Sequence, residues 1–280
     1  MKLSIVIAGR DDGYGDEGLS PYDKNTPDTF CFRMKRTVES NLKKLKKHNI
    51  STQYVIVDWS PINGKSLDKN EYTSETVKDE RVKHIIVTPE IVENRGWNPK
   101  NFYEYYAKNV GIRNSDGEFV LITNPDDLLN DELVESISKA LDEDDGKNYY
   151  RPYSRIDVDN KLQFLAEGVT FLKNGNPYDE IMGTPAAGDF ILTTKDNFIN
   201  ISKGFDETQN TNGNKQQTHM DGNIVINMYQ NGLIPKELKG SVLHLDHAKP
   251  HEKDFNIEPY TKGYENIENW GLLNIKFWLI

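Results

Sequence analysis

The chain has 280 residues, a formal net charge of −10 at pH 7 and a single cysteine, Cys31. This length buries a core without covalent cross-links, and one cysteine excludes both an intrachain disulfide and a cysteine-rich zinc module. Because the negative charge would repel a phosphate backbone, no nucleic-acid partner is expected.

The apolar runs of the sequence are too short to cross a membrane. The first, residues 3–9, is followed at once by Arg10, Asp11 and Asp12. No run approaches the roughly 20 residues that a spanning helix needs, and the first is also too short for a signal sequence. The protein is therefore expected to be cytoplasmic, without a membrane span.

The first half of the chain alternates strands and helices. Residues 3–9, 53–59, 82–88 and 118–123 are short β-branched runs typical of buried strands. The intervening stretches 33–48 and 101–114 carry apolar residues at helical spacing, and the lysines of the first stretch predict its solvated face. This alternation predicts an α/β fold: a doubly wound, mostly parallel (mixed) sheet with helices on both faces.

The second half contains fewer and more widely spaced elements. A helix over 130–141 is predicted from a capping Asn130 and an apolar face. Residues 188–194 and 241–247 are predicted strands and 220–232 a helix, with polar loops between them.

Polar residues follow three of the predicted strands, at "AGRDDGYG", "DWSP" and "TNPDD". In open parallel sheets, ligands bind beyond the carboxyl ends of the strands, so these residues should face one crevice. Asn124 and Asp126 lie two apart and offer oxygen donors for a hard divalent cation that bridges phosphates. The same residues also favour a turn that caps the next helix, and the sequence leaves both readings open.

Two further groups carry possible chemistry. His244 and His247 lie three apart near the end of a predicted strand and would complete the coordination of a cation begun by Asp126. Asp221 lies at a predicted helix start, where an Asp is either an N-cap or a group that accepts a proton from a substrate hydroxyl. The sequence does not choose between these roles.

With "SIVIAGRDDGYG", "VIVDWSP", "AKNVGIRNSDGEFVLITNPDD", "GDFILTTKDNFINISKGFDE" and "HMDGNIVINMYQNGL" in this order, almost the whole chain resembles the glycosyltransferase family 2 group of nucleotide-sugar enzymes. The most specific part is residues 109–127, where Gly111, Gly117 and Phe119 are in register with the family's lead into its Asp-x-Asp metal motif. The resemblance implies a single GT-A domain over residues 1–280. Residues 1–127 would form its nucleotide-binding half, and residues 128–280 its acceptor-binding half and C-terminal segment.

The resemblance also implies roles for individual residues. The donor nucleotide would contact residues that follow the strands or lie near the metal motif, namely Ala8, Gly9, Arg10, Asp12, Asp58, Trp59, Asn109, Arg113, Asn124 and Asp126. Asn124 stands where the first Asp of the metal motif usually stands, Asp58 would contact uracil or ribose, and Arg113 is equally readable as a helix-surface charge.

The cation, Mn²⁺ or Mg²⁺, would be held by Asp126 with His244 or His247. Asp221 keeps the Asp of the family's Glu-Asp motif, while Met220 replaces the Glu, so Asp221 is the expected catalytic base. Gly188 and Asp189 would lie near the donor sugar.

The activity implied is that of a metal-dependent, inverting hexosyltransferase. It would move a sugar from a nucleoside diphosphate, expected to be UDP, to a hydroxyl of a glycan, lipid-linked or protein acceptor. The alternatives are a sugar nucleotidyltransferase, although the loop after residue 9 is acidic for a triphosphate cradle, and a GT-A fold binding or scaffold protein without turnover. A dinucleotide oxidoreductase is set aside, because no Gly-x-Gly-x-x-Gly follows the first strand.

Overall fold

The computed structural model describes residues 1–13, 18–19, 27–170, 190–207, 220–247, 270–272 and 278–279; for 18–19, 27–28, 167–170, 220–221 and 278–279 it describes the backbone alone. Within these ranges, ten strands form one sheet and two short strands, β2 (Gly18–Leu19) and β3 (Pro27–Asp28), pair separately.

The first half of the chain builds the parallel part of the large sheet. β5 (Val82–Val87), β4 (Thr52–Trp59), β1 (Leu3–Gly9) and β6 (Phe119–Thr123) lie side by side in that order, each parallel to its neighbour. The four strands predicted from β-branched runs are confirmed. Their carboxyl ends meet at one edge, as the sequence predicted.

The second half extends the sheet with antiparallel pairs. β10 (Phe190–Thr194) is antiparallel to β6 and to β8 (Asn148–Val158), while β11 (Ile234–Leu245) runs parallel to β8. The short β7 (Asp127–Leu129) is antiparallel to β11, β9 (Phe164–Thr170) to β8, and β12 (Trp278–Leu279) to β5. The sheet is therefore mixed, and its parallel neighbours are concentrated in the first half.

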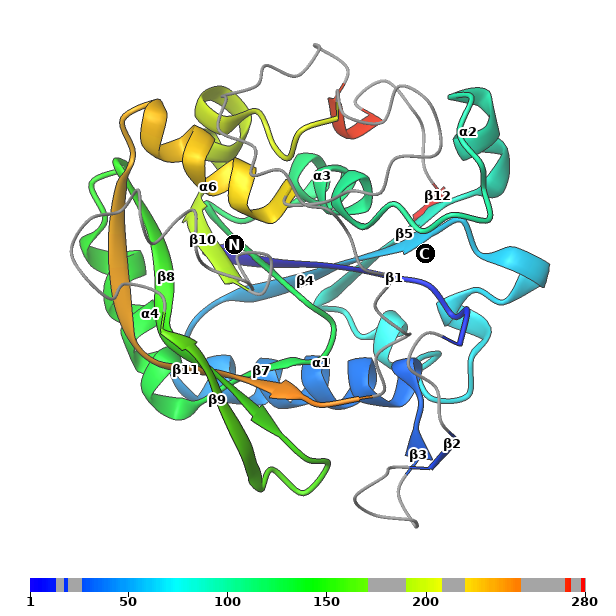
Figure 1. Cartoon of the computed structure of the whole chain (residues 1–280), viewed down its shortest axis with the longest axis horizontal. Helices are drawn as coiled ribbons and strands as arrows, with labels where there is room; N and C mark the ends of the chain where they lie inside the picture. Colours follow the sequence, from blue (N-terminus) through cyan, green and yellow to red (C-terminus); the bar gives the residue numbers. More distant parts are fainter. Residues whose placement is uncertain are drawn as a thin grey trace.

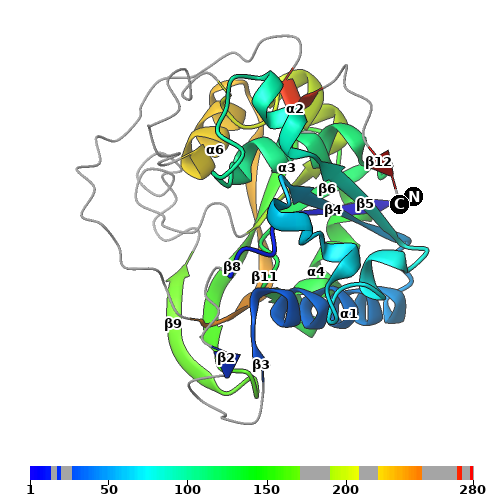
Figure 2. The same ribbon diagram turned by 90° about the vertical axis from the view of Figure 1, so that its right-hand side faces the viewer.

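Helices cover both faces of the sheet (Figures 1 and 2). α1 (Phe30–Lys47) and α4 (Asp131–Glu143) lie on one face; α3 (Glu104–Asn114) and α6 (Met220–Gln230) lie on the other. Each face of the sheet has its own hydrophobic core, and β1 contributes to both. Ile5 and Ile7 pack with α1 and α4, while Val6 and Ala8 pack with α3 and α6. Alternate side chains of a strand point to opposite faces, so a continuous apolar run is what a doubly covered strand requires.

Shorter helical segments connect these elements. Between β4 and β5 lie three 3₁₀ turns, η1 (Ile62–Gly64), η2 (Leu67–Lys69) and η3 (Thr76–Lys78), and α2 (Pro89–Asn94) follows β5. η5 (Asn197–Ser202) is a π-helical segment after β10, and η7 (Trp270–Leu272) packs on α3. Asn130 caps α4 as predicted, since its Oδ1 accepts a hydrogen bond from the Leu133 amide at 2.8 Å.

Two glycines of the family-like pattern lie where a side chain has no room. A Cβ on Gly111 would lie 2.3 Å from Cγ1 of Val6, and one on Gly117 would lie 2.5 Å from the backbone nitrogen of Ser4. The first contact lets α3 approach β1 closely, and the second lets the turn before β6 lie against the start of β1. Both glycines therefore set the packing that brings α3 and β6 to the site.

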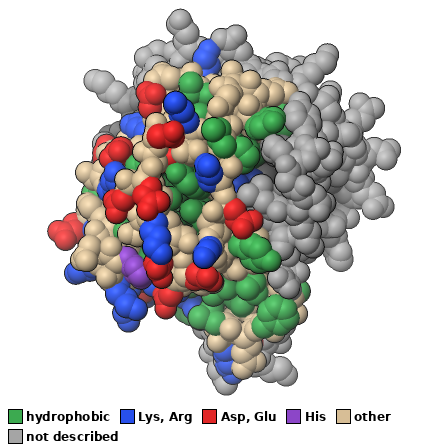
Figure 3. Space-filling model, turned by 90° about the vertical axis from the view of Figure 1, so that its left-hand side faces the viewer, with side chains coloured by type: hydrophobic (Ala, Val, Ile, Leu, Met, Phe, Trp, Pro, Cys, Tyr) green, Lys and Arg blue, Asp and Glu red, His purple; other side chains and the backbone are tan. Residues whose placement is uncertain are grey.

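No helix in the described part of the chain is both long and apolar enough to span a membrane. On the face shown in Figure 3, acidic and basic side chains are interspersed among the described residues rather than gathered by sign.

Candidate functional site

The Asn-Pro-Asp-Asp stretch makes a tight turn between β6 and β7. The carboxylate of Asp127, fully buried, accepts hydrogen bonds from the Thr123 hydroxyl at 3.2 Å and the Asn124 amide at 3.1 Å. Asn41 of α1 binds the backbone that follows the turn: its side chain donates to the Asp127 carbonyl at 3.0 Å and accepts from the Leu129 amide at 2.9 Å. Asp127 is thus the structural acid of the turn, and Asp126 is the acid that faces outward to the cavity.

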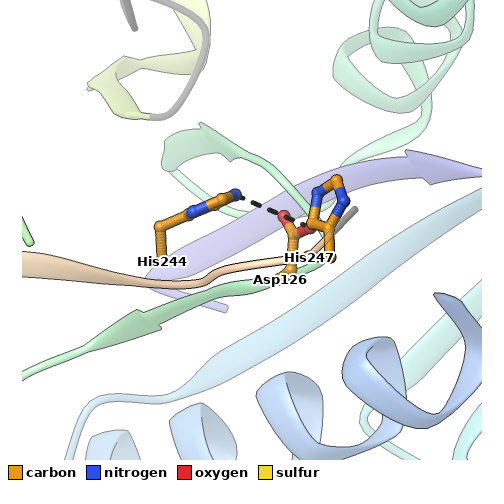
Figure 4. A group of neighbouring side chains, drawn as sticks. All are labelled: Asp126, His244 and His247. Carbon is orange, nitrogen blue, oxygen red and sulfur yellow. Dashed lines mark ion pairs between the residues drawn. The ribbon is translucent and has the colours of Figure 1, made fainter. Parts of the chain in front are cut away.

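Both candidate histidines lie beside Asp126 (Figure 4). β7 pairs with β11 so that His244 stands opposite Asp127, and the Leu245 amide donates to the Asp126 carbonyl at 3.0 Å. Oδ2 of Asp126 lies 3.2 Å from Nε2 of His247 and 3.8 Å from Nε2 of His244. The sequence left open whether His244 or His247 lies beside Asp126, and the fold places both there.

The three side chains fit a metal site. One ligand atom from each lies within 4.8 Å of the others. Ligands bound at about 2.1 Å to an octahedral cation lie about 3 Å apart when adjacent and about 4 Å apart when opposite. Two imidazoles and a carboxylate therefore need only small movements to share one divalent cation.

The electrostatics of the cluster favour an ionised Asp126. The carboxylate is 7% exposed and also lies 4.0 Å from Nε of the buried Arg33. Burial by itself would raise the pKa of Asp126, but the charge of His244, the hydrogen bond and charge of His247 and the charge of Arg33 together hold that pKa well below its ordinary value. Asp126 is therefore ionised at neutral pH, as a carboxylate that binds a cation must be.

A second pair of charged residues reaches the cluster from β8. Asp157 Oδ1 lies 3.1 Å from Nδ1 of His244 and accepts from Nε of Arg155 at 3.0 Å, while a terminal nitrogen of Arg155 lies 2.9 Å from the same Nδ1. The hydrogen bond from His244, helped by the charge of Arg155 and opposed by burial, lowers the pKa of Asp157 to about 2.

Asn124 is held from α3. Nζ of Lys108, a fully buried lysine, donates to Oδ1 of Asn124 at 2.8 Å and to Oε1 of Glu104 at 2.6 Å. The side-chain oxygen of Asn124 is therefore directed toward the lysine. Glu104 thus offers the lysine a carboxylate, whereas the Asn124 amide offers it an uncharged acceptor.

A cavity of about 530 Å³ opens at this edge of the sheet, within the size range of small-ligand sites. Its lining comes from the end of β1, the starts of α1 and α3, the turn after β6, and the strands β8 and β11. The lining residues are Ala8, Gly9, Arg10, Asp12, Phe30, Phe102, Glu104, Asn124, Pro125, Asp126, Arg155, His244 and His247. Eight of the predicted site residues are thus brought together: Ala8, Gly9, Arg10, Asp12, Asn124, Asp126, His244 and His247.

Arg10 shapes the rim of this cavity. Its guanidinium donates twice to Asp12, at 2.9 and 2.7 Å, and to the carbonyls of Pro99 and Lys100 at 3.3 and 3.0 Å. It also lies 5.7 Å from the ring centre of Phe102. Arg10 therefore fixes the loop before α3 against the end of β1.

Two predicted nucleotide contacts at the end of β4 lie away from this cavity. Asp58 is fully buried and accepts from the Ser66 hydroxyl at 2.7 Å and the Leu67 amide at 2.9 Å, because the loop after β4 folds back over it. Trp59 is fully buried in an aromatic cluster with Trp97. This arrangement does not support the prediction that Asp58 and Trp59 touch the nucleotide.

The same holds for the two predicted contacts on α3. Asn109 is fully buried, donates to the Phe205 carbonyl and to Glu207 at 2.9 and 2.8 Å, and accepts from the Phe205 amide at 2.7 Å. Arg113 stacks on Trp270 at 3.8 Å from the ring centre and donates to its carbonyl. Both residues fasten later segments to α3 instead of lining the cavity.

The remaining predicted residues are only partly described. Asp221 is the second described residue of α6, so the predicted helix is present there, but the side chain of Asp221 lies outside the described set. Gly188 and Asp189 also lie outside the described residues.

The sequence reasoning missed Glu104, Lys108, Arg155 and Asp157. The spacing of these residues is a signal that could have found them. Glu104 and Lys108 are four apart on a helix, and Arg155 and Asp157 are two apart on a strand, and both spacings place two side chains on one face. Arg155 and Asp157 were hidden because Pro152 and the surrounding charges interrupt the apolar pattern of β8.

No protein-family model matches the sequence, and no curated protein matches it. Solved structures do match. TarS from S. aureus in complex with UDP-GlcNAc superposes with a TM-score of 0.53 at 17% identity, covering 91% of this chain and 60% of that chain. Another crystal structure of the same TarS fragment gives 0.54 at 16% identity, over 88% of this chain and 60% of that one.

A mannosyltransferase from Pyrobaculum calidifontis in complex with GDP-Man and Mn²⁺ gives a TM-score of 0.50 at 12% identity, over 87% of this chain and 56% of that one. The chain has a GT-A-like fold. It spans about three fifths of the length of these structures. These matches confirm the predicted GT-A-like α/β architecture. At identities of 12 to 17%, they are evidence for the fold alone.

Proposed function

We propose that the protein is a metal-dependent, inverting glycosyltransferase that uses a nucleoside-diphosphate sugar, with UDP as the nucleotide. The observation that carries the proposal is the cluster of Asp126, His244 and His247 on a cavity at the carboxyl ends of β1 and β6. In open α/β sheets this edge is where ligands bind. Among the solved structures with this fold, one TarS complex contains UDP-GlcNAc, another contains UDP, and the mannosyltransferase contains GDP-Man with Mn²⁺, which supports a nucleotide-sugar donor.

The donor would lie with its diphosphate beside Asp126. A divalent cation held by Asp126, His244 and His247 would neutralise charge on the leaving diphosphate. At the end of β1, Ala8 has a small side chain and Gly9 has none, so this part of the lining adds little bulk to the cavity. The Phe30 ring packs against Gly9, where a Cβ would lie 2.4 Å from it. Arg10 and Asp12 would keep the rim in place.

Asp221 is proposed as the base. At the start of α6 its carboxylate would take the proton of the acceptor hydroxyl as that oxygen attacks the anomeric carbon. Attack from the face opposite the leaving diphosphate inverts the configuration. Residues 1–127 would then supply most of the nucleotide site and residues 128–280 the acceptor side, with a glycan, a lipid-linked sugar or a protein as acceptor.

Incubation with a panel of nucleoside-diphosphate sugars and Mn²⁺ tests this function. Release of the nucleoside diphosphate, by hydrolysis or transfer, is expected with a UDP-sugar, and Asp221→Asn should reduce it by about 100-fold or more, as loss of a general base does. Asp131→Asn, the same change at the start of α4, is the matched control and should keep full activity. Release of pyrophosphate from a sugar phosphate and a nucleoside triphosphate would instead identify a nucleotidyltransferase. A protein that binds the donor without any turnover would be a scaffold.

A further inference from the structure

Arg155 and Asp157 lie two apart on β8 and both reach His244. β8 and β11 run parallel with Asp157 directly beside His244 in the register. Asp157 is 25% exposed and Arg155 17% exposed at their side chains, and Arg155 lines the same cavity as Asp126. Both residues are therefore part of the site without being among the three metal-ligand candidates.

Their contacts make opposite demands on one atom of His244. An ionised Asp157 can only accept hydrogen bonds, so its contact with Nδ1, at 3.1 Å, requires a proton on Nδ1. The Arg155 guanidinium can only donate, so its contact with the same Nδ1, at 2.9 Å, requires a lone pair there. To bind a metal the imidazole must be neutral and so carry one proton, and in this form each contact selects a different tautomer. Only the tautomer with the proton on Nδ1 leaves a lone pair on Nε2, which is the atom directed toward Asp126.

We propose that Asp157 is a positioning residue that holds His244 in the Nδ1–H tautomer for metal binding, and that Arg155 is a diphosphate-binding residue. The inference rests on the proposed function. A hydrogen bond to an ionised carboxylate is stronger than one to a neutral nitrogen, so Asp157 wins the competition for Nδ1. Carboxylate partners of this kind fix the ring orientation and tautomer of metal-ligating histidines.

The role of Arg155 follows from the same geometry. Once Nδ1 carries a proton, it no longer accepts from the Arg155 nitrogen beside it. A diphosphate in the cavity offers acceptor oxygens that match the planar fork of a guanidinium. Nε of Arg155 donates to Asp157 at 3.0 Å and the side chain lines the cavity, so the guanidinium is anchored beside the place where the diphosphate would lie.

Two measurements on the full chain test the role of Asp157. The first is the ¹⁵N spectrum of the histidine side chains without metal, which distinguishes the two tautomers, with His244 assigned from a His244→Gln variant. The second is Mn²⁺ binding without nucleotide, followed by the electron paramagnetic resonance of free Mn²⁺. Asp157→Asn is expected to shift His244 toward the Nε2–H tautomer and to lower Mn²⁺ affinity by about 10- to 100-fold. Asp157→Glu should restore part of both.

Asp116→Asn is the matched control, because Asp116 is a carboxylate before β6, at the opposite edge of the sheet, whose partners are Gln53 and Lys83. It should leave both readouts unchanged. Arg155→Met should lower UDP affinity in the presence of Mn²⁺ by about tenfold, while Mn²⁺ affinity without nucleotide does not fall.

The outcomes separate this inference from the proposed function. In one outcome, the wild type binds Mn²⁺ and UDP, and Asp157→Asn keeps the wild-type tautomer of His244 and an Mn²⁺ affinity within threefold of the wild-type value. Asp157 then has no positioning role, while the proposed function stands. If Arg155→Met binds UDP as the wild type does, Arg155 is not a diphosphate-binding residue. If the wild type itself binds no Mn²⁺, both the metal-dependent function and this inference are overturned.

Discussion

Replacing Asn124 with Asp restores the acid that the resembled family usually has at this position, and tests which way the side chain faces. Oδ1 of Asn124 lies 2.8 Å from the buried ammonium of Lys108. A carboxylate there would attract the lysine by about 6 kcal/mol at an effective dielectric constant of about 20. Desolvation of the new charge offsets most of this, and so does repulsion by Asp126, which leaves a net stabilisation of about 1 to 2 kcal/mol.

The expected result of Asn124→Asp is therefore a higher unfolding midpoint, by about 2 to 4 °C for a chain of this size. Mn²⁺ affinity should change by less than about threefold, because the new carboxylate pairs with the lysine instead of the cation. Differential scanning calorimetry and Mn²⁺ titration measure the two effects. A tenfold or greater gain in Mn²⁺ affinity with no gain in stability would mean that position 124 faces the cation, and would refute the reasoning. In the double variant with Lys108→Met, the carboxylate loses its partner, so the stability gain should disappear.

Three further predictions concern the packing that supports the site. Asn41→Ala removes three buried hydrogen bonds, to one hydroxyl and two backbone groups, and should lower the free energy of unfolding by about 3 kcal/mol in urea titrations; a loss below about 1 kcal/mol would mean that these bonds do not hold the turn. Gly111→Ala places a methyl group 2.3 Å from Val6 and should cost about 1 to 3 kcal/mol. The control is Gly222→Ala, also in a helix, where no described atom outside that helix's own backbone lies within 4 Å of the added Cβ. It should be neutral or stabilising, and equal effects at the two sites would contradict this reading. Burial raises the pKa of Glu207 despite its hydrogen bonds, so its contribution to stability is present at low pH and is lost as the pH rises from about 4.3 through the raised value. The stability of Glu207→Gln relative to the wild type should therefore grow between pH 4 and pH 7, and a constant difference would contradict the assignment.

The sequence predicted those parts of the fold that are encoded locally. The strands of the parallel part are continuous β-branched runs because both of their faces are buried, and the helices have apolar residues at helical spacing. β8 was not predicted, because its eleven residues include Pro152 and several charges, and its place in the sheet comes from pairing with β10 and β11, far away in the sequence. Pairing at such distance leaves little trace in a local pattern.

The site shows the same division. The turn at Asn124 and the proximity of Asp126 to the histidines agree with expectations from strand ends and from the family resemblance. Asp58 also follows a strand end, but no local pattern in the sequence indicates that the loop after it folds back and takes both of its hydrogen bonds. The positions of Arg155 and Asp157 depend on the register between β8 and β11, so they became visible only in three dimensions.

The most direct test of the central claim is calorimetric titration of the wild-type chain with UDP, with and without Mn²⁺. The account predicts binding that is at least tenfold tighter in Mn²⁺, and loss of this difference in Asp126→Asn, because the carboxylate is the ligand nearest to both histidines. Equal UDP affinity with and without Mn²⁺, or no binding under either condition, would contradict the assignment of Asp126, His244 and His247 as the metal site of a nucleotide-sugar enzyme.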